Sequence, residues 1–517
     1  MPIPIIDLFA GPGGLGEGFS SAKGIAGGSA FKIGLSIEKD PIAHRTLCLR
    51  ATYRLLKDNG DTDAYYDYVR GTLNRDAFLK IPNVSEAMRH AMDEARCAEL
   101  GRPELVSQVD RWVQAAISGQ TDWVLVGGPP CQAYSLAGRS RRTNDNDFER
   151  DVKHFLYGYY LRMIRVFAPP VFVMENVKGM LSSTHRGNSV FSRMIEDLSQ
   201  PAANLGYEIR SFTTDDTTGN ALLPQDFVIR SEKYGVPQKR HRVILLGVRS
   251  DLAGRNHLLL RPSDPLTVDD VIGNMAKIRS GVSRSKEKTD EWWKIVRDTQ
   301  RLLGGWKDES RDKVLKCLQE ALSSYPPDST GLPFVAIASE KCAPRGLSSW
   351  LHDPMLGGVI QHQARSHMAS DLQRYLFASS YSKATGRAPK LRNFPKRLLP
   401  EHENVTTNDG SIPFEDRFRV QGSTSPSTTV VSHIAKDGHY YIHPDPTQCR
   451  SLTVREAARL QTFPDNYFFE GNRTQQYTQV GNAVPPFLAI QLGEIVSALL
   501  NQQKNDSAQL FQREKAA

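Results

Sequence analysis

The chain has 517 residues, of which 39% are hydrophobic and 24% are charged, a balance typical of a globular protein rather than a disordered or fibrous one. It is too long for one ordinary core, so we expect two domains. The formal net charge of +8 favours a polyanionic partner. No apolar run is long enough to cross a membrane and no signal peptide is recognisable, which predicts a protein inside the cell without membrane contact.

Short apolar strands alternate with helical patterns over residues 3–250, and glycine or proline marks the turns. This alternation predicts an α/β fold with a mainly parallel, doubly wound sheet. A largely helical stretch, roughly 76–118, reads as an insertion between the second and third strands. The strand candidates are Ile3–Phe9, Lys32–Ile37, Trp123–Val126, Val171–Met174, Tyr207–Phe212 and Arg242–Val248.

A glycine-rich turn follows the first predicted strand. Gly11-x-Gly13-x-x-Gly16 fits the dinucleotide fingerprint, and Glu38 ends the next strand at the spacing of a ribose-binding carboxylate. Such a turn can hold a nicotinamide, a flavin or S-adenosylmethionine, or it can be purely structural. Phe9, just before the turn, either stacks on an adenine ring or packs in the core.

Cys131 follows the apolar run 123–126 and a Gly-Gly-Pro-Pro turn. The carboxyl ends of parallel strands are where open α/β sheets bind ligands, so this cysteine is a candidate nucleophile, with a buried structural thiol as the alternative. The six cysteines of the chain are scattered without a Cys-x-x-Cys pair, so we expect reduced thiols and no metal site.

A carboxylate and two arginines complete the candidate site. Glu175 ends the apolar run 171–174, and Arg240 and Arg242 alternate along the start of a later strand, so both project from one face. A thiol, a carboxylate and an arginine pair at strand ends of one sheet can converge. The alternative for the arginines is a solvated edge.

From about residue 255 the periodicity weakens and turn signals multiply, which indicates an irregular second domain. After the prolines at 485–486, leucine and isoleucine recur at helical spacing. We therefore divide the chain into a first domain at 1–254, a second at 255–470 and a segment at 471–517 that completes the first.

Six segments in this order resemble the DNA (cytosine-5)-methyltransferase family. They are the glycine turn with Phe9, Pro130-Cys131-Gln132, Glu175-Asn176-Val177, Gln238-Lys239-Arg240-His241-Arg242, the Arg-Glu-Ala-Ala-Arg-Leu-Gln-Thr-Phe-Pro element at 455–464, and Gly481-Asn482-Ala483-Val484-Pro485. The resemblance implies a Rossmann-like S-adenosylmethionine-dependent methyltransferase domain with a smaller, irregular target-recognition domain.

The resemblance also implies roles. Cys131 attacks carbon 6 of a cytosine flipped out of double-stranded DNA, Glu175 holds the ring N3 and amine, Arg242 binds the base oxygen, and Arg240 positions the thiolate. The substrate-binding residues are Gln132, Ser135, Asn176 and Gln238. Those for S-adenosylmethionine are Phe9, Gly11, Gly13, Gly14, Glu38, Pro130, Asn482 and Val484.

One family residue has no clear counterpart, namely the Asp after the third strand that contacts the adenine amine, for which Asp67 and Asp76 are candidates. Basic residues near DNA read as phosphate contacts or as a solvated surface. They are Arg139, Arg141 and Arg142 in the loop after the nucleophile, and Arg365, His367, Arg374, Lys390 and Arg392 in the second domain.

The family further implies a monomer in the cytoplasm of a prokaryotic or phage host cell, with a cognate restriction or defence system as a further partner. Three alternatives stay open. They are a transfer RNA cytosine-5 methyltransferase with the same active site, a nicotinamide-dependent oxidoreductase built on the glycine turn, and a catalytically silent DNA-binding relative.

Overall fold

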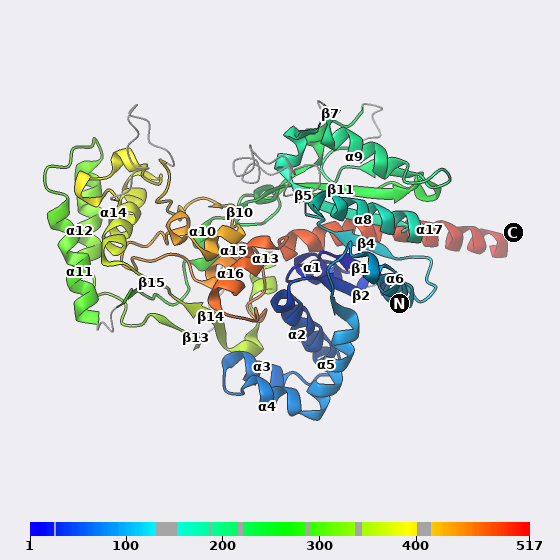
Figure 1. The fold of residues 1–517 in the computed structure, drawn as a ribbon, viewed down its shortest axis with the longest axis horizontal. Helices are drawn as coiled ribbons and strands as arrows, with labels where there is room; N and C mark the ends of the chain where they lie inside the picture. Colours follow the sequence, from blue (N-terminus) through cyan, green and yellow to red (C-terminus); the bar gives the residue numbers. More distant parts are fainter. Residues whose placement is uncertain are drawn as a thin grey trace.

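The computed structural model describes residues 1–24, 27–130, 152–185, 188–215, 221–284, 289–336, 344–400 and 415–516. Its central sheet has the strand order β3-β2-β1-β4-β5-β11-β8, with β9 paired to β11. The strands from β3 to β5 pair in parallel, and β11 runs antiparallel to both β5 and β8. The predicted α/β class with a mainly parallel sheet is confirmed (Figure 1).

The sheet strands are β1 (Ile3–Leu8), β2 (Phe31–Glu38), β3 (Ala95–Cys97), β4 (Val124–Gly127), β5 (Val171–Val177), β8 (Tyr207–Arg210), β9 (Val228–Arg230) and β11 (His241–Arg249). Short strands pair outside it: β6 (Thr184–His185) with β7 (Asn188–Ser189), β10 (Gln238–Lys239) with β16 (Ser427–Thr428), β12 (Gly281–Val282) with β15 (Ser366–His367), and β13 (Gly331–Ala336) with β14 (Gly358–Gln363).

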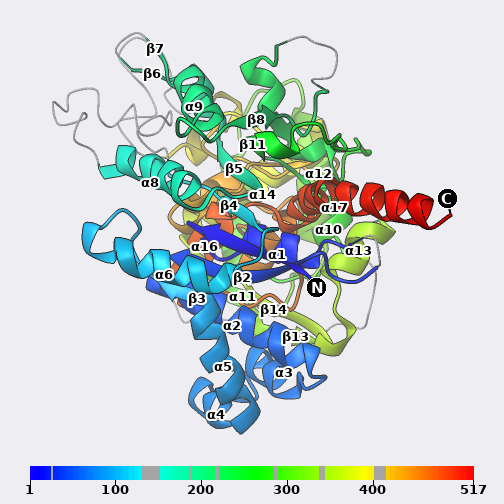
Figure 2. The same cartoon turned by 90° about the vertical axis from the view of Figure 1, so that its right-hand side faces the viewer.

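Helices cover both faces of the sheet, as Figure 2 shows with α17 on one side and α6 and α8 on the other. On the first face, α1 and α17 pack on the strands through apolar residues at helical spacing, including Leu488, Leu492 and Leu499. The helices around the sheet are α1 (Gly14–Ser21), α2 (Pro41–Asp58), α3 (Asp63–Arg70), α4 (Arg75–Lys80), α5 (Pro82–Glu94), α6 (Val106–Ile117), α8 (Val152–Phe167), α9 (Val190–Ser199) and α17 (Pro486–Ala516).

One described helical stretch, Arg473–Gln502, is apolar and long enough to cross a membrane by composition alone. Of its most apolar window, 72% is buried inside the protein, since α17 packs against α1 and the sheet. Its apolar side chains therefore serve the protein core.

The stretch 76–118 is largely helical, as its sequence predicts, but it also contains a strand. Between α5 and α6 it contributes β3, which pairs in parallel with β2 at the edge of the sheet. Three residues, Ala-Arg-Cys, are too few and too polar to show a strand pattern, so the strand escapes sequence analysis.

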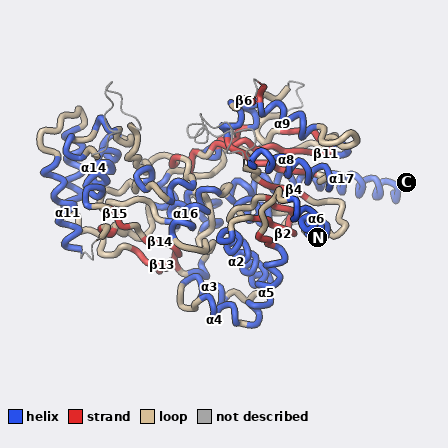
Figure 3. Tube along the Cα trace, in the orientation of Figure 1, coloured by secondary structure: helices blue, strands red, loops and turns tan. Residues whose placement is uncertain are grey.

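The second half of the chain has two further cores. One surrounds α10 (Val268–Ile272), α13 (Arg345–Leu351), α15 (Val454–Leu460) and α16 (Arg473–Asn482). The other lies within a body that we call the helical lobe, built from α11 (Thr289–Leu302), α12 (Arg311–Ser323) and α14 (Ala369–Thr385) with the segment 386–398. Figure 3 shows this lobe as a group of helices at the end of the molecule opposite the tip of α17.

Candidate active site

The glycine turn follows β1 and leads into α1. Gly11 and Gly13 take positive φ angles of 57° and 92°, the left-handed region that glycine adopts without strain. Phe9, with φ 59°, is half-buried against the core of the sheet. The Gly11 amide donates to Glu38 Oε2 (2.8 Å), and the Asp40 amide donates to Glu38 Oε1 (2.8 Å). The turn and the end of β2 are therefore held together by one carboxylate.

Two glycines of the turn face different surroundings. A Cβ at Gly14 would lie 2.2 Å from the Val484 carbonyl oxygen, so the segment after α16 approaches the turn closely only because this residue is glycine. A Cβ at Gly11 would meet nothing within 4 Å. The turn thus offers open space at Gly11, as a ligand cradle requires. Val484 is buried and Asn482 is exposed beside it.

Asp7 lies below this turn and is fully buried, and among the described residues no side chain forms a hydrogen bond with its carboxylate oxygens. A Cβ at Gly16 would lie 3.1 Å from Asp7 Oδ2, which places the carboxyl group against the first turn of α1. Burial raises the pKa of Asp7 to about 8, and the nearby Glu38 adds to the increase. The carboxyl group therefore keeps its proton at neutral pH.

The first carboxylate after the third strand of the sheet is Glu99. Because Cys97 pairs in register with Glu38, Glu99 lies at the same strand ends as the glycine turn. Arg102 donates to Glu99 Oε2 (2.7 Å) and holds the pKa of this carboxyl group below its usual value. No sequence signal marks Glu99, because the short strand β3 that precedes it has no apolar pattern.

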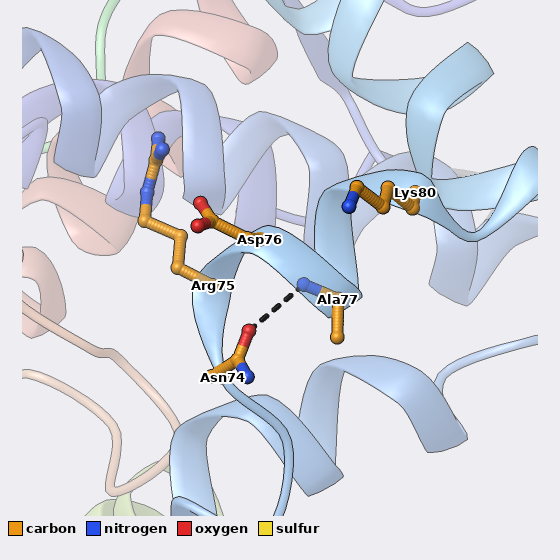
Figure 4. A pocket seen from close by; sticks show the side chains of 5 residues that line it. All are labelled: Asn74, Arg75, Asp76, Ala77 and Lys80. Atoms are coloured by element: carbon orange, nitrogen blue, oxygen red, sulfur yellow. Dashed lines mark hydrogen bonds between the residues drawn. The ribbon is translucent and has the colours of Figure 1, made fainter.

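Asp67 and Asp76 lie elsewhere, on α3 and α4, which pack with one another, α5 and the β13 hairpin. Asp76 is exposed in a shallow pocket of about 370 Å³ whose other lining residues are Asn74, Arg75, Ala77 and Lys80 (Figure 4). Neither aspartate follows a strand of the central sheet, so neither takes the predicted place after the third strand.

Glu175 and Arg242 meet at the junction of β5 and β11. These strands pair antiparallel with Arg242 opposite Val177, and Arg242 Nε lies 2.9 Å from Glu175 Oε1. Their side chains are 15% and 14% exposed, so the pair is largely desolvated but reachable. Desolvation strengthens such a charge-assisted bond and fixes its geometry.

The turn that leads to Cys131 lies directly against this pair. A Cβ at Gly128 would be 2.9 Å from Glu175 Oε2. Asn176 donates from Nδ2 to the Pro129 carbonyl (3.1 Å), which ties the diproline turn to β5. Pro130, half-buried, is the last described residue before the predicted nucleophile. Cys131, Gln132, Ser135, Arg139, Arg141 and Arg142 lie outside the described residues.

Arg240 and Gln238 contact the protein itself. Arg240 Nη1 donates to the carbonyls of Val430 (2.8 Å) and Gly481 (3.2 Å), and burial together with Arg242 lowers its pKa. Gln238 is fully buried; its amide donates to Leu460 O and Gln461 Oε1 and accepts from Val430 N. Both side chains thus join the sheet to the second half of the chain.

Buried ion pairs organise the segment 450–470. Arg450 donates to both carboxylate oxygens of Glu456 at 2.7 Å, and Arg459 is paired in the same way with Asp465. The Tyr467 hydroxyl donates to the carbonyl of Pro12 in the glycine turn. This segment, which lies far from the glycine turn in the sequence, therefore supports the turn in the folded protein. Its motif does not reveal this role.

The second-domain residues expected near DNA divide into two groups. Arg365 donates to the carbonyls at 434 and 435, Arg374 is bound to Asp371 and the Leu398 carbonyl, and His367 is buried, which lowers its pKa to about 3. These three form internal contacts, contrary to the expectation. Lys390 and Arg392 are exposed. The described residues hold no cluster of three or more potential metal ligands from His, Cys, Asp and Glu.

Comparison with known proteins agrees with this arrangement. Residues 110–497 match the family model of C-5 cytosine-specific DNA methylases. The type II methyltransferase M.Bpa9945I of Bacillus paralicheniformis is 33% identical over 96% of this chain and 99% of its own length. The type II methyltransferase M.AgeI of Thalassovita gelatinovora is 28% identical over 96% and 99%.

A solved structure of a protein assigned as a DNA modification methyltransferase, encoded within an Escherichia coli prophage, has the same fold. Its TM-score is 0.50 at 17% identity, over 97% of this chain and 100% of that one. The family match covers most of the chain, and the first of these relatives aligns nearly end to end. The chain therefore belongs to the C-5 cytosine-specific DNA methylase family, as a DNA (cytosine-5-)-methyltransferase.

Proposed function

We propose that the protein methylates carbon 5 of a cytosine flipped out of a specific double-stranded DNA sequence, through a covalent adduct with Cys131. The observation that carries this proposal is the Glu175–Arg242 pair, held at 2.9 Å beside the Gly128–Pro130 turn that leads to the cysteine. A carboxylate and a guanidinium in this position match the edge of a cytosine, which presents an amine donor and an oxygen acceptor.

The proposed mechanism follows from the low nucleophilicity of carbon 5 in cytosine. Carbon 5 is not nucleophilic until a thiolate adds to carbon 6, so Sγ of Cys131 forms a bond there and leaves an enamine. Glu175 stabilises the adduct by sharing a proton with N3, and Arg242 binds the base oxygen. Carbon 5 would then take the methyl group from the sulfonium donor, which would leave as a neutral thioether. Water would take the carbon 5 proton, and elimination of Sγ would restore the thiolate and the aromatic ring.

The turn after β1 has the features of an S-adenosylmethionine site. Gly11 leaves open space, and Glu38, fixed by two backbone amides, is placed for ribose hydroxyls. Phe9 offers a ring face for the adenine, and Glu99 is the carboxylate for the adenine amine. When bound, S-adenosylmethionine supplies an electrophilic methyl group. Gly13, Gly14, Pro130, Asn482 and Val484 complete the proposed site.

Arg240 and Gln238 contribute to this proposal as positioning residues. By fixing Val430 and residues 460–461 against β10 and β11, they hold the second half of the chain beside Arg242. Asn176 acts similarly, because its bond to Pro129 sets the direction in which the chain leaves β4. Gln132 and Ser135 are assigned to the loop that closes over the base.

The biological setting follows the type II methyltransferase relatives. We assign the protein to the bacterial cytoplasm, as a monomer whose methylation protects DNA from a cognate restriction enzyme. The match to a DNA methylase family disfavours the transfer RNA alternative.

The decisive experiment is methylation of unmodified genomic DNA followed by bisulfite mapping. Methylation confined to one short recurring sequence supports the proposal; labelling of RNA with none of DNA overturns it. The adduct is tested with target duplexes that carry 5-fluorocytosine, because fluorine at carbon 5 prevents the final elimination. Cys131→Ser should lose the covalent band while retaining S-adenosylmethionine binding, whereas Cys317→Ser, on α12, should keep both. A persistent band with Cys131→Ser would exclude this nucleophile.

A further inference from the structure

Residues 383–397 of the helical lobe form a segment that we call the basic strip. Its formal charge is +6, against +8 for the whole chain, and it contains no acidic residue. The cations are Lys383, Arg387, Lys390, Arg392, Lys396 and Arg397, and all six are exposed. The last three residues of α14, two short 3-10 turns and the residues between them thus carry a charge of +6, against a net charge of +8 for the protein.

The strip is arranged so that its cations face outward. Leu391, Phe394 and Leu398 alternate with them and are buried in the core of the lobe, at 2% to 5% exposure. Phe394 packs against Phe377 of α14 and against Phe418. The apolar side chains therefore anchor the segment and leave the charged ones at the surface.

Hydrogen bonds to neighbouring elements fix the backbone of the strip. The Trp306 indole donates to the Asn393 carbonyl (2.9 Å), and the Leu391 amide donates to the Glu415 carbonyl (2.7 Å). Arg374 of α14 donates to the Leu398 carbonyl (2.8 Å). An irregular segment is thereby held in one conformation, so its charges form a fixed array.

Carboxylates of the described residues neutralise little of this array. Glu415 alone is shared by Lys390 (2.9 Å) and Arg392 (3.2 Å). Arg387 is near enough to Asp308 to contribute to the lowered pKa of that carboxyl group, but Lys383, Arg387, Lys396 and Arg397 form no ion pair within 4 Å in the described part of the chain. Like charges closer than about 10 Å repel at physiological salt, so a fixed array of this kind gains free energy from a polyanion with regularly spaced charges.

We propose that the basic strip binds the phosphate backbone of the DNA beside the methylated sequence, independently of base sequence. The inference rests on the proposed function, since it takes duplex DNA as the substrate. The helical lobe lies at the end of the molecule opposite the tip of α17, with β5 and β11 between the two, so a duplex seated at these strands has to extend beyond its target to reach the lobe (Figure 1). Exposed lysine and arginine without base-reading geometry are suited to this role.

The test compares salt dependence of binding. In one variant Lys383, Arg387, Lys396 and Arg397 are all replaced by Gln; in a matched control the exposed Lys32, Lys80, Arg89 and Arg111 are replaced. Binding to a random-sequence duplex of about 45 base pairs is measured by anisotropy between about 50 and 200 mM NaCl. Each phosphate contact contributes about 0.9 to the salt slope, so the wild type should lose about 10- to 100-fold more affinity over this range than the strip variant.

Further variants separate charge from structure. Exchange of Lys for Arg and Arg for Lys at the same four positions keeps the charge and should restore the wild-type slope. The double variant K396Q/R397Q, with a smaller change, should reduce the slope by about half as much. An unaltered slope in the strip variant, or an equal reduction in the control, overturns the proposal, and so does tighter binding of duplex RNA than of duplex DNA.

The position of the contact is tested with duplexes centred on the mapped target. The affinity loss of the strip variant should appear with long arms and vanish when the duplex is trimmed close to the target; an equal loss on both overturns the flanking placement. Bisulfite mapping with the same preparations distinguishes the two proposals. If the wild-type protein methylates its target sequence but the strip substitutions leave the salt slope unchanged, only the proposal for the basic strip is refuted. If the wild-type protein does not methylate DNA, the proposed function is refuted.

Discussion

One end of the central sheet, where Glu38, Glu175 and Arg242 lie, holds its polar residues in a different way from the helical lobe. We call this end the sheet edge. At the sheet edge, strand pairing brings Glu175 to Arg242, and one carboxylate, Glu38, bonds to two backbone amides. In the lobe, apolar anchors bury one side of an irregular segment and leave its cations in water. The first arrangement gives few groups in fixed, desolvated positions, as covalent chemistry requires. The second gives many solvated charges, which suit a partner recognised by charge alone.

The largest effect is expected at the Glu175–Arg242 pair. Glu175→Gln removes the carboxylate that we propose shares a proton with the base, so the rate of methyl transfer to the mapped target under single-turnover conditions should fall by about 10²- to 10⁴-fold. The matched control is Glu232→Gln, which removes the charge from the neighbouring hydrogen-bonded pair with His241 (2.9 Å). A similar loss in both variants would mean that the effect comes from the strands rather than from the base site.

The next largest effect concerns stability. Arg450 and Glu456 are completely buried, so Glu456→Gln leaves a buried cation without its partner and should cost about 3–5 kcal/mol of unfolding free energy. Asp93→Asn breaks the largely solvated pair with Arg96 and should cost less than about 1 kcal/mol. Urea unfolding measures both; equal losses would mean that the buried pair contributes no more to stability than the solvated one.

A smaller effect distinguishes the two glycines of the turn. Gly14→Ala places a methyl group against the Val484 carbonyl and should cost about 1–3 kcal/mol of stability. Gly11→Ala has room for the methyl group and suffers only the left-handed backbone, about 1–2 kcal/mol, but should weaken S-adenosylmethionine binding in calorimetry. Unchanged binding in Gly11→Ala would remove the cradle from the proposed site.

Sequence patterns predicted most of this end of the sheet because each candidate site residue there follows a strong local signal. Glu175 and Arg242 adjoin runs of apolar residues that can only be buried strands, and the predicted strands agree with β1, β4, β5 and β11 to within three residues at each end. The same logic explains a failure. Glu99 could not be found, because β3 has three residues and no apolar run.

In the second half of the chain, long-range contacts decide the role of each residue. Arg365 looks like a surface cation, but its partners are carbonyls about 70 residues away, at 434 and 435. His367 is buried because Tyr375 and Ser451 pack on it. Nothing near these residues in the sequence marks them as internal, whereas the exposed cations of 383–397 are marked by the absence of acidic neighbours.

The last prediction concerns the pH dependence of the unfolding free energy that comes from Asp7, which is small for a change of one pH unit. Its pKa is raised from 3.8 to about 8 in the folded protein, so the folded state binds one more proton than the unfolded state between these values. The resulting stabilisation is complete below about pH 4 and is lost progressively as the pH rises from about 4 to about 8, at about 1.4 kcal/mol for each pH unit. Asp7→Asn cannot titrate, so its unfolding free energy should improve relative to wild type over this range and level off above it. All other groups titrate alike in both proteins and cancel in the difference. Parallel urea-unfolding curves from pH 5 to 9 would show that Asp7 is ionised in the folded state, and the sheet edge would then resemble the lobe in holding a charge at neutral pH.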